Sequence, residues 1–217
     1  AGPLGADGTP GAPPADVTPV PFNARSRVHE YGGGALFVHE DMAFFSHFPD
    51  QRVYFCRLRP PDADATAEPP APLTPAEGGW RFADFDVDVA GNRLVCVAER
   101  HAPDGAVANM VAAVALPGAG PSRAGVDEDG APPEVLFQGH DFYAAPRVLP
   151  AKGDRPALVA FVAWDHPSMP WDLTAIRVRP LPGPGGAAAG PGPTLDIQGG
   201  SCLEPRWLGD GGLLAHV

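Results

Sequence analysis

The chain has 217 residues, with 15 basic against 26 acidic side chains and a formal net charge of −11. A charge of this sign repels nucleic acids and anionic membrane surfaces, so we expect neither as a partner. No apolar run reaches the roughly 18–20 residues that span a bilayer, and the first residues lack a secretory signal. We therefore predict a soluble intracellular protein, without distinguishing cytoplasm from organelle.

Clusters of glycine and proline at 1–21, 60–79, 117–133 and 180–193 predict loops, and we expect 1–21 to be a disordered leader. Short apolar runs between the clusters are bounded by turn residues, which is typical of β-strands. Strands are predicted at 35–38, 42–46, 52–57, 80–87, 93–99, 109–116, 134–138, 142–148, 157–164, 174–179, 194–198, 202–207 and 213–217. Helical periodicity is nearly absent, and the one helix candidate, 107–116, has a valine content that favours a strand.

Three cysteines, Cys56, Cys96 and Cys202, lie far apart in apolar strand-like runs. An odd number at such spacing indicates neither a disulfide framework nor a zinc site. We expect buried free thiols in a reducing compartment.

The predicted strands recur at a fixed interval. Ala145-Pro146-Arg147, followed by a turn and a buried strand, is matched 59 residues later by Glu204-Pro205-Arg206, and Ala83-Asp84 occupies the same place about 62 residues earlier. Four strands in about 60 residues are typical of one β-propeller blade, and blades bury their faces by stacking. We therefore predict an all-β fold, a partial β-propeller of about three to four four-stranded antiparallel blades over 22–217.

Catalytic motifs are missing from the chain. A serine-hydrolase elbow requires Gly-x-Ser-x-Gly on a strand-to-helix turn; 199–203 fails at its last position, and 120–124 lies in a proline-rich loop. The histidines lack the spacing of a zinc protease, and the acidic residues lack the loop pattern of a calcium site. We therefore assign no catalytic residue, no metal ligand and no cofactor.

Two segments carry candidate binding residues. In 22–35, Arg27, His29 and Glu30 precede three glycines; arginine suits a carboxylate and glutamate an α-ammonium, so these residues are candidate substrate contacts. The alternative is that Arg27 and Glu30 pair with neighbouring strands, while the glycines allow close backbone packing. In 164–172, Trp164, His166 and Trp171 indicate either an interface with a partner domain or a rigid, self-packed loop.

Several motifs occur together in order. They are RVHEYGGG at 27–34, RFAD at 81–84, DFYAAPR at 141–147, WDHPSMPWD at 164–172 and EPRW at 204–207. Over roughly 17–217 the chain thus resembles the propeller domain of the prolyl oligopeptidase family of serine peptidases, in its acylaminoacyl-peptidase/dipeptidyl-peptidase-like branch. The resemblance implies a seven-bladed propeller that caps an α/β-hydrolase domain holding the catalytic Ser, Asp and His, with short peptides entering between the two.

From this resemblance we expect a chain truncated at both ends, with about three and a half blades and no activity of its own. Its expected role is substrate gating within a serine peptidase that forms an acyl-enzyme, with the hydrolase domain and a short peptide as partners. The alternative is a non-enzymatic β-propeller-like protein-interaction module.

Overall fold

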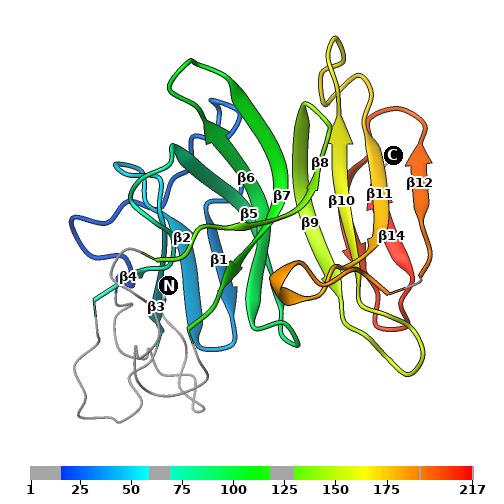
Figure 1. The fold of residues 1–217 in the computed structure, drawn as a ribbon, viewed down its shortest axis with the longest axis horizontal. Coiled ribbons are helices and arrows are strands. Elements are labelled where there is room, and N and C mark those ends of the chain that lie inside the picture. Colours follow the sequence, from blue (N-terminus) through cyan, green and yellow to red (C-terminus); the bar gives the residue numbers. More distant parts are fainter. Residues whose placement is uncertain (1–15, 59–68, 118–129, 191, 217) are drawn as a thin grey trace, which may run out of the picture.

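The computed structural model describes residues 16–58, 69–117, 130–190 and 192–216. Within these ranges it contains fourteen strands and one 3-10 turn, Pro184–Gly186. Figure 1 shows the sheets following one another in chain order, from the blue strands to the red ones. Among the described residues, no helix is long and apolar enough to cross a membrane.

Each complete sheet is a four-stranded antiparallel meander whose strands are neighbours in the order of the chain. The first sheet contains β1 (Leu36–His39), β2 (Met42–Ser46), β3 (Val53–Arg57) and β4 (Ala71–Pro72). The second contains β5 (Trp80–Asp88), β6 (Arg93–His101), β7 (Val107–Ala115) and β8 (Glu134–Gln138). The third contains β9 (Phe142–Leu149), β10 (Leu158–Trp164), β11 (Ala175–Pro180) and β12 (Leu195–Gln198). A final pair consists of β13 (Leu203–Trp207) and β14 (Leu213–His216).

These elements confirm the predicted strands, to within a few residues at their ends. The helix candidate at 107–116 is strand β7. Strand β4 was not predicted because it consists of two residues, Ala71 and Pro72, inside a proline-rich stretch, and pairing with Tyr54 and Phe55 alone defines it. Residues 59–68 and 118–129 of the predicted loops, and the last residue of the predicted strand 213–217, lie outside the described residues.

The second and third sheets are buried on both faces, which explains the continuous apolar runs of β6 and β10. Three apolar clusters alternate with the sheets along the stack. Phe44 packs with Phe82 between the first and second sheets, and Val95 packs with Val159 between the second and third. Ile176 belongs to the third cluster, between the third sheet and the final strand pair. Each inner sheet contributes one face to the cluster before it and the other face to the cluster after it. This is how the blades of a propeller pack.

The first strands of successive sheets lie next to one another. Three of these strands, β5, β9 and β13, each contain a β-bulge. Register shifts occur in β5, β9 and β13, where Asp84, Ala145 and Glu204 adopt left-handed backbone with φ of 55, 48 and 50°. These are the positions at which the sequence repeats. The sequence repeat therefore corresponds to a recurring backbone feature, a β-bulge that bends the first strand of each of these three sheets.

The bulge of β5 joins three sheets through one carboxylate. Asp84 accepts the Gly34 N–H through Oδ1 at 2.6 Å and the Ala145 N–H through Oδ2 at 3.0 Å. Asp86 on the same strand accepts the Val148 N–H at 2.7 Å. Carboxylates of β5 thus accept backbone N–H groups from the segments on both sides of the second sheet.

The three glycines at 32–34 allow the chain to pass close to the same bulge. A Cβ placed on Gly33 would lie 2.9 Å from the Ala83 Cβ, and one on Gly34 would lie 2.8 Å from Asp84 Oδ1. Gly32 has a φ of 91°, which a glycine adopts without strain. Close backbone packing, the structural alternative for these glycines, is therefore present.

Residues 16–21, the described part of the predicted leader, and Phe22 directly after them lie against the first sheet. Phe22 packs edge-on against Phe45 and Tyr54, with ring centroids 5.8 and 5.3 Å apart. The Cys56 Sγ donates to the carbonyl of Val17 at 3.4 Å. All three cysteines are free and buried, as predicted. Residues 1–15 lie outside the described residues, and the division at 21/22 stays a prediction.

We expect Asp84→Ala to destabilise the protein by roughly 2–4 kcal/mol, since two charge-assisted hydrogen bonds are lost and alanine is strained at positive φ. Urea denaturation followed by tryptophan fluorescence measures the change. Asp104→Ala is the matched control, because that carboxylate lies in an exposed turn and accepts the Ala106 N–H, a single hydrogen bond among the described residues. Equal effects of the two substitutions would contradict the bridging role of Asp84.

We expect Gly33→Ala to cost about 1–3 kcal/mol, because the added methyl meets the buried Ala83 Cβ, which cannot move without the backbone. Gly190→Ala is the control, since a Cβ there would have no heavy atom within 4 Å. Thermal melts of both variants compare the two sites. A Gly33→Ala protein as stable as Gly190→Ala would show that the backbone at Gly33 leaves room for a methyl group beside Ala83.

Candidate functional site

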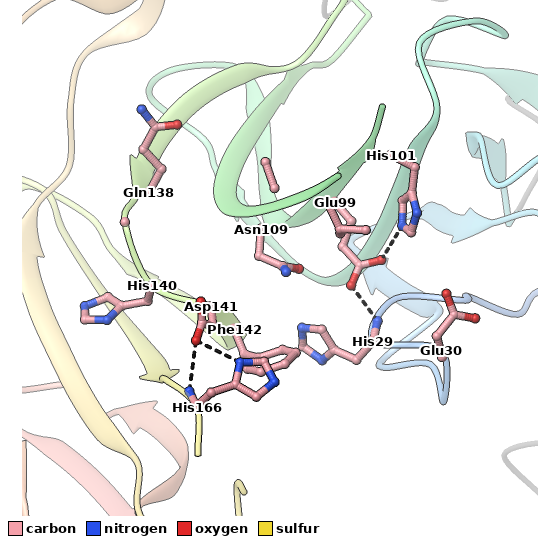
Figure 2. Close-up of a pocket in the computed structure, with 13 residues that line it drawn as sticks. His29, Glu30, Glu99, His101, Asn109, Gln138, His140, Asp141, Phe142 and His166 are labelled. Atoms are coloured by element: carbon pink, nitrogen blue, oxygen red, sulfur yellow. Dashed lines mark hydrogen bonds and ion pairs between the residues drawn. The ribbon is translucent and has the colours of Figure 1, made fainter. Parts of the chain in front are cut away.

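A pocket of about 670 Å³ opens at one rim of the second and third sheets. Its walls come from the end of β6 and start of β7, the link between β8 and β9, the loop after β10, and the turn at 29–30. Because alternate strands run in opposite directions, these junctions all reach the same rim of the stack. Figure 2 shows side chains from both sheets and the turn surrounding this space.

Glu99 connects the 29–30 turn to the second sheet. Its side chain is only 3% exposed and directly follows the apolar run Leu94–Ala98 of strand β6. Oε1 accepts the His29 N–H at 2.6 Å, and Oε2 lies 3.0 Å from His101 Nε2 and 3.9 Å from the Arg81 guanidinium. A buried carboxylate persists only with such partners, and these partners hold the 29–30 turn against the second sheet (Figure 2).

The turn itself places His29 and Glu30 at the pocket. Both residues have left-handed backbone, with φ of 54 and 64°, which folds the chain back tightly. The Arg81 guanidinium donates to Glu30 Oε1 at 2.6 Å and to the Arg27 carbonyl at 2.8 Å. This hydrogen bond from Arg81 lowers the pKa of the Glu30 carboxyl.

His29 is surrounded by aromatic rings from the third sheet. Its ring lies 5.3 Å from Phe142 and 5.4 Å from Trp164, both edge-on, and Phe142 stacks on Trp164 at 5.2 Å. Burial lowers the pKa of His29, so its imidazole is neutral near pH 7. Its Nε2 atom is buried and has no hydrogen-bond partner among the described residues.

Two reciprocal Asp–His pairs brace the opposite wall. His140 Nδ1 lies 2.8 Å from Asp165 Oδ2, and Asp141 Oδ2 accepts both the backbone N–H and Nδ1 of His166 at 2.9 Å. Asp165 Oδ1 also accepts the Asp141 N–H at 2.7 Å. These bonds tie the β8–β9 link to the loop after β10. The hydrogen bonds from His166 lower the pKa of Asp141.

The structure brings together some of the sequence candidates and separates others. His29, Glu30 and His166 line the pocket, whereas the Arg27 guanidinium lies over the Phe48 ring, 4.4 Å from its centroid. Trp164, the last residue of the predicted strand 157–164 and the first of the segment 164–172, is the last residue of β10 and only 6% exposed. Trp171 lies outside the pocket lining and is 68% exposed. The predicted roles of all six residues stay predictions.

The sequence patterns do not single out five further residues that line the pocket, namely Glu99, His101, Asn109, His140 and Asp141. For Glu99 the sequence does contain a signal. It is a carboxylate at the end of a strand predicted to be buried on both faces, and such a carboxylate requires a polar or charged partner. Within the described ranges, no group of three or more His, Cys, Asp or Glu side chains could hold a metal ion. Ser122, in the weak 120–124 motif, lies outside those ranges.

No family model and no curated protein sequence matches the chain. Similar solved structures exist. Puromycin hydrolase is 30% identical over 91% of this chain, with TM-scores of 0.69 for a serine-to-alanine mutant complexed with PGG and 0.68 for a second structure. A puromycin-hydrolyzing peptidase from Mycobacterium tuberculosis is 31% identical over the same share, with a TM-score of 0.65. This chain spans 29% of the length of each of these proteins.

Puromycin hydrolase is a peptidase of the prolyl oligopeptidase family. The likeness therefore confirms the resemblance of this chain to the propeller portion of that family. It also confirms the all-β fold, because the stacked meanders match the propeller domains of these peptidases.

The Asp141–His166 pair predicts a pH-dependent contribution to stability. Because the folded-state pKa of Asp141 lies below its usual 3.8, its charge stabilises the fold above that pH, and the contribution is lost as pH falls through the folded pKa. We expect the stability difference between wild type and Asp141→Asn to be larger at pH 5 than at pH 3. Urea midpoints at the two pH values measure it, with Asp104→Asn in an exposed turn as the control. A difference that grows toward pH 3 would contradict this assignment.

Proposed function

We propose that this chain is the substrate-gating propeller portion of a serine peptidase that hydrolyses short peptides. The observation that carries the proposal is 30% identity, over 91% of the chain, to part of puromycin hydrolase. The activity resides in an α/β-hydrolase domain that packs on the propeller and supplies the Ser, Asp and His. The serine attacks the peptide carbonyl, the amine leaves with a proton from the histidine, and water then hydrolyses the acyl-enzyme.

The chain's own part is to bind and admit the peptide. Arg27, His29 and Glu30 are proposed substrate contacts, with His29 and Glu30 at the pocket itself. Arg27 contributes from the neighbouring surface over Phe48. The pocket lies at a rim where strand ends and loops meet, the usual location for binding residues on a rigid β-scaffold.

The loop after β10 is proposed to contact the hydrolase domain. Trp171 is 68% exposed, and Met169 and Leu173 beside it are also exposed. The loop is held in one shape, because Met169 N–H donates to Asp172 Oδ2 at 3.1 Å and Ser201 Oγ donates to the Pro170 carbonyl at 2.7 Å. A preformed apolar surface of this kind loses little entropy on docking. His166, which Asp141 holds by two hydrogen bonds, and Trp164, which ends the strand before the loop, are the other two proposed interface residues.

We expect the purified 217-residue chain to show no turnover of chromogenic aminoacyl or acyl-aminoacyl substrates and no labelling by a fluorophosphonate probe. The reason is that its sequence contains no Gly-x-Ser-x-Gly. A known serine hydrolase, labelled in parallel, is the positive control. Covalent labelling of the native chain, absent after heat denaturation, would overturn the proposal that another domain supplies the nucleophile.

Sequencing the coding region after the codon for Val217 separates the proposal from the alternative. A Gly-x-Ser-x-Gly motif followed by Asp and His supports the peptidase. A stop codon at that point contradicts it and favours a non-enzymatic protein-interaction module.

A further inference from the structure

Two arginines share one aromatic ring beside the first sheet. The guanidinium carbon of Arg25 lies 4.7 Å from the centroid of the Phe48 ring, and that of Arg27 lies 4.4 Å from it. Both arginines are exposed, and the ring is half-buried in the turn that follows β2. Two like charges are therefore held around one flat surface that faces solvent.

This positive charge is not neutralised locally. Among the described residues, neither guanidinium group forms an ion pair or a hydrogen bond. The acids of the adjoining segments have other partners. Glu30 Oε1 accepts from the Arg81 guanidinium at 2.6 Å, and Asp50 Oδ2 accepts from the Tyr54 hydroxyl at 2.8 Å. In a chain with a net charge of −11, such an excess of positive charge is a property of the site, and an anion between the two groups relieves their repulsion.

The fold holds both arginines in place before a ligand binds. The backbone N–H of Arg25 donates to the Ser46 carbonyl at 2.9 Å. The backbone N–H of Arg27 donates to Gln51 Oε1 at 2.7 Å, and the same buried amide donates to the Phe48 carbonyl at 2.8 Å. A guanidinium stacked on a ring keeps its N–H edge available to a ligand, and its restricted motion reduces the entropy lost on binding.

The third sheet shows what a pair of arginines at this spacing binds. Arg177 and Arg179 are two residues apart on β11, as Arg25 and Arg27 are in their segment. Arg177 lies 2.6 Å from one carboxylate oxygen of Asp196, and Arg179 lies 2.7 Å from the other. One carboxylate thus satisfies two guanidinium groups. The first pair lacks that carboxylate among the described residues, which indicates a carboxylate as its ligand.

The two arginines lie at the same rim of the stack as the pocket. Strands β2, β6 and β10 are each the second strand of their sheet, so the turn after β2 and the loops after β6 and β10 reach one rim. The Arg81 guanidinium donates both to the Arg27 carbonyl and to Glu30 at the pocket. Neither arginine lines the pocket, and neither does Phe48. A ligand on the arginines therefore occupies a separate surface that adjoins the pocket.

We propose that Arg25 and Arg27, stacked on Phe48, bind a carboxylate group of a peptide at this site outside the pocket. The carboxylate comes from a free carboxyl terminus or from an aspartate or glutamate side chain. The assignment gives Arg25 a role and specifies the group that Arg27, a proposed substrate contact, binds. This inference rests on the proposed function, and it makes peptides that carry a carboxylate the substrate class.

The test is binding of three acetylated peptides, which carry no ammonium, to the 217-residue chain, measured by NMR titration. N-acetyl-Gly-Gly has a free carboxylate and is expected to bind at least about fivefold more tightly than N-acetyl-Gly-Gly amide. N-acetyl-Asp-Gly amide separates the two sources: binding comparable to N-acetyl-Gly-Gly shows that the site accepts side chains as well, and weak binding restricts it to carboxyl termini. Equal binding of the acid and its amide, or no binding of any peptide, would overturn the proposal.

Substitutions locate the binding. Arg25→Gln and Arg27→Gln are each expected to weaken binding of N-acetyl-Gly-Gly by at least about fivefold. Arg100→Gln is the matched control and is expected to leave the affinity unchanged. That guanidinium also lies over a ring, 5.5 Å from the Trp80 centroid, but no second arginine among the described residues shares the ring.

Both site variants are expected to fold, because neither guanidinium group makes a hydrogen bond within the described part of the chain, and their NMR spectra verify this. Unchanged binding by either folded variant, or an equal loss in Arg100→Gln, overturns the proposal. These outcomes do not depend on the fluorophosphonate result, so the carboxylate site and the peptidase assignment fail separately.

Discussion

Burial of both faces of a four-stranded sheet is the constraint on which the rest of this structure depends. Strand β6 is apolar from Leu94 to Ala98 and β10 is apolar throughout, so neither sheet could be stable with one face in water. Stacking the sheets solves this and brings their first strands side by side. The bulges at Asp84, Ala145 and Glu204 then bend these strands, and the Asp84 carboxylate bonds to backbone groups that the bend would otherwise leave free.

The candidate site follows from the same stacking. Where strands of two neighbouring sheets end at one rim, their polar terminal residues meet, and the turn at 29–30 lies against both sheets. Glu99 can be buried there because the His29 N–H, His101 and the Arg81 guanidinium lie around its carboxylate. The two Asp–His pairs hold the other wall in place. The pocket is thus preformed by contacts of the fold, as binding sites for small ligands usually are.

The pocket's chemistry also clarifies the segment 22–35. Its glycines serve packing, since they let the backbone pass the β5 bulge, and Arg27 lies over an aromatic ring. The part that reaches the pocket is the two-residue turn of His29 and Glu30. The segment 22–35 therefore packs against the second sheet through its glycines and contributes His29 and Glu30 to the pocket. These two roles explain why charged residues and glycines occur together in it.

Sequence alone determined the strands other than β4, the repeat of about 60 residues, the buried free cysteines and the family resemblance. These follow from local patterns: apolar runs, turn residues and short motifs are properties of neighbouring residues. It did not determine that Glu99, His101, Asn109, His140 and Asp141 would meet His29. Those residues are up to 112 positions apart, as for His29 and Asp141, and nothing in the local pattern relates them. Only the stacking of the sheets, driven by burial of their apolar faces, decided which strand ends share a rim and therefore which side chains form the pocket.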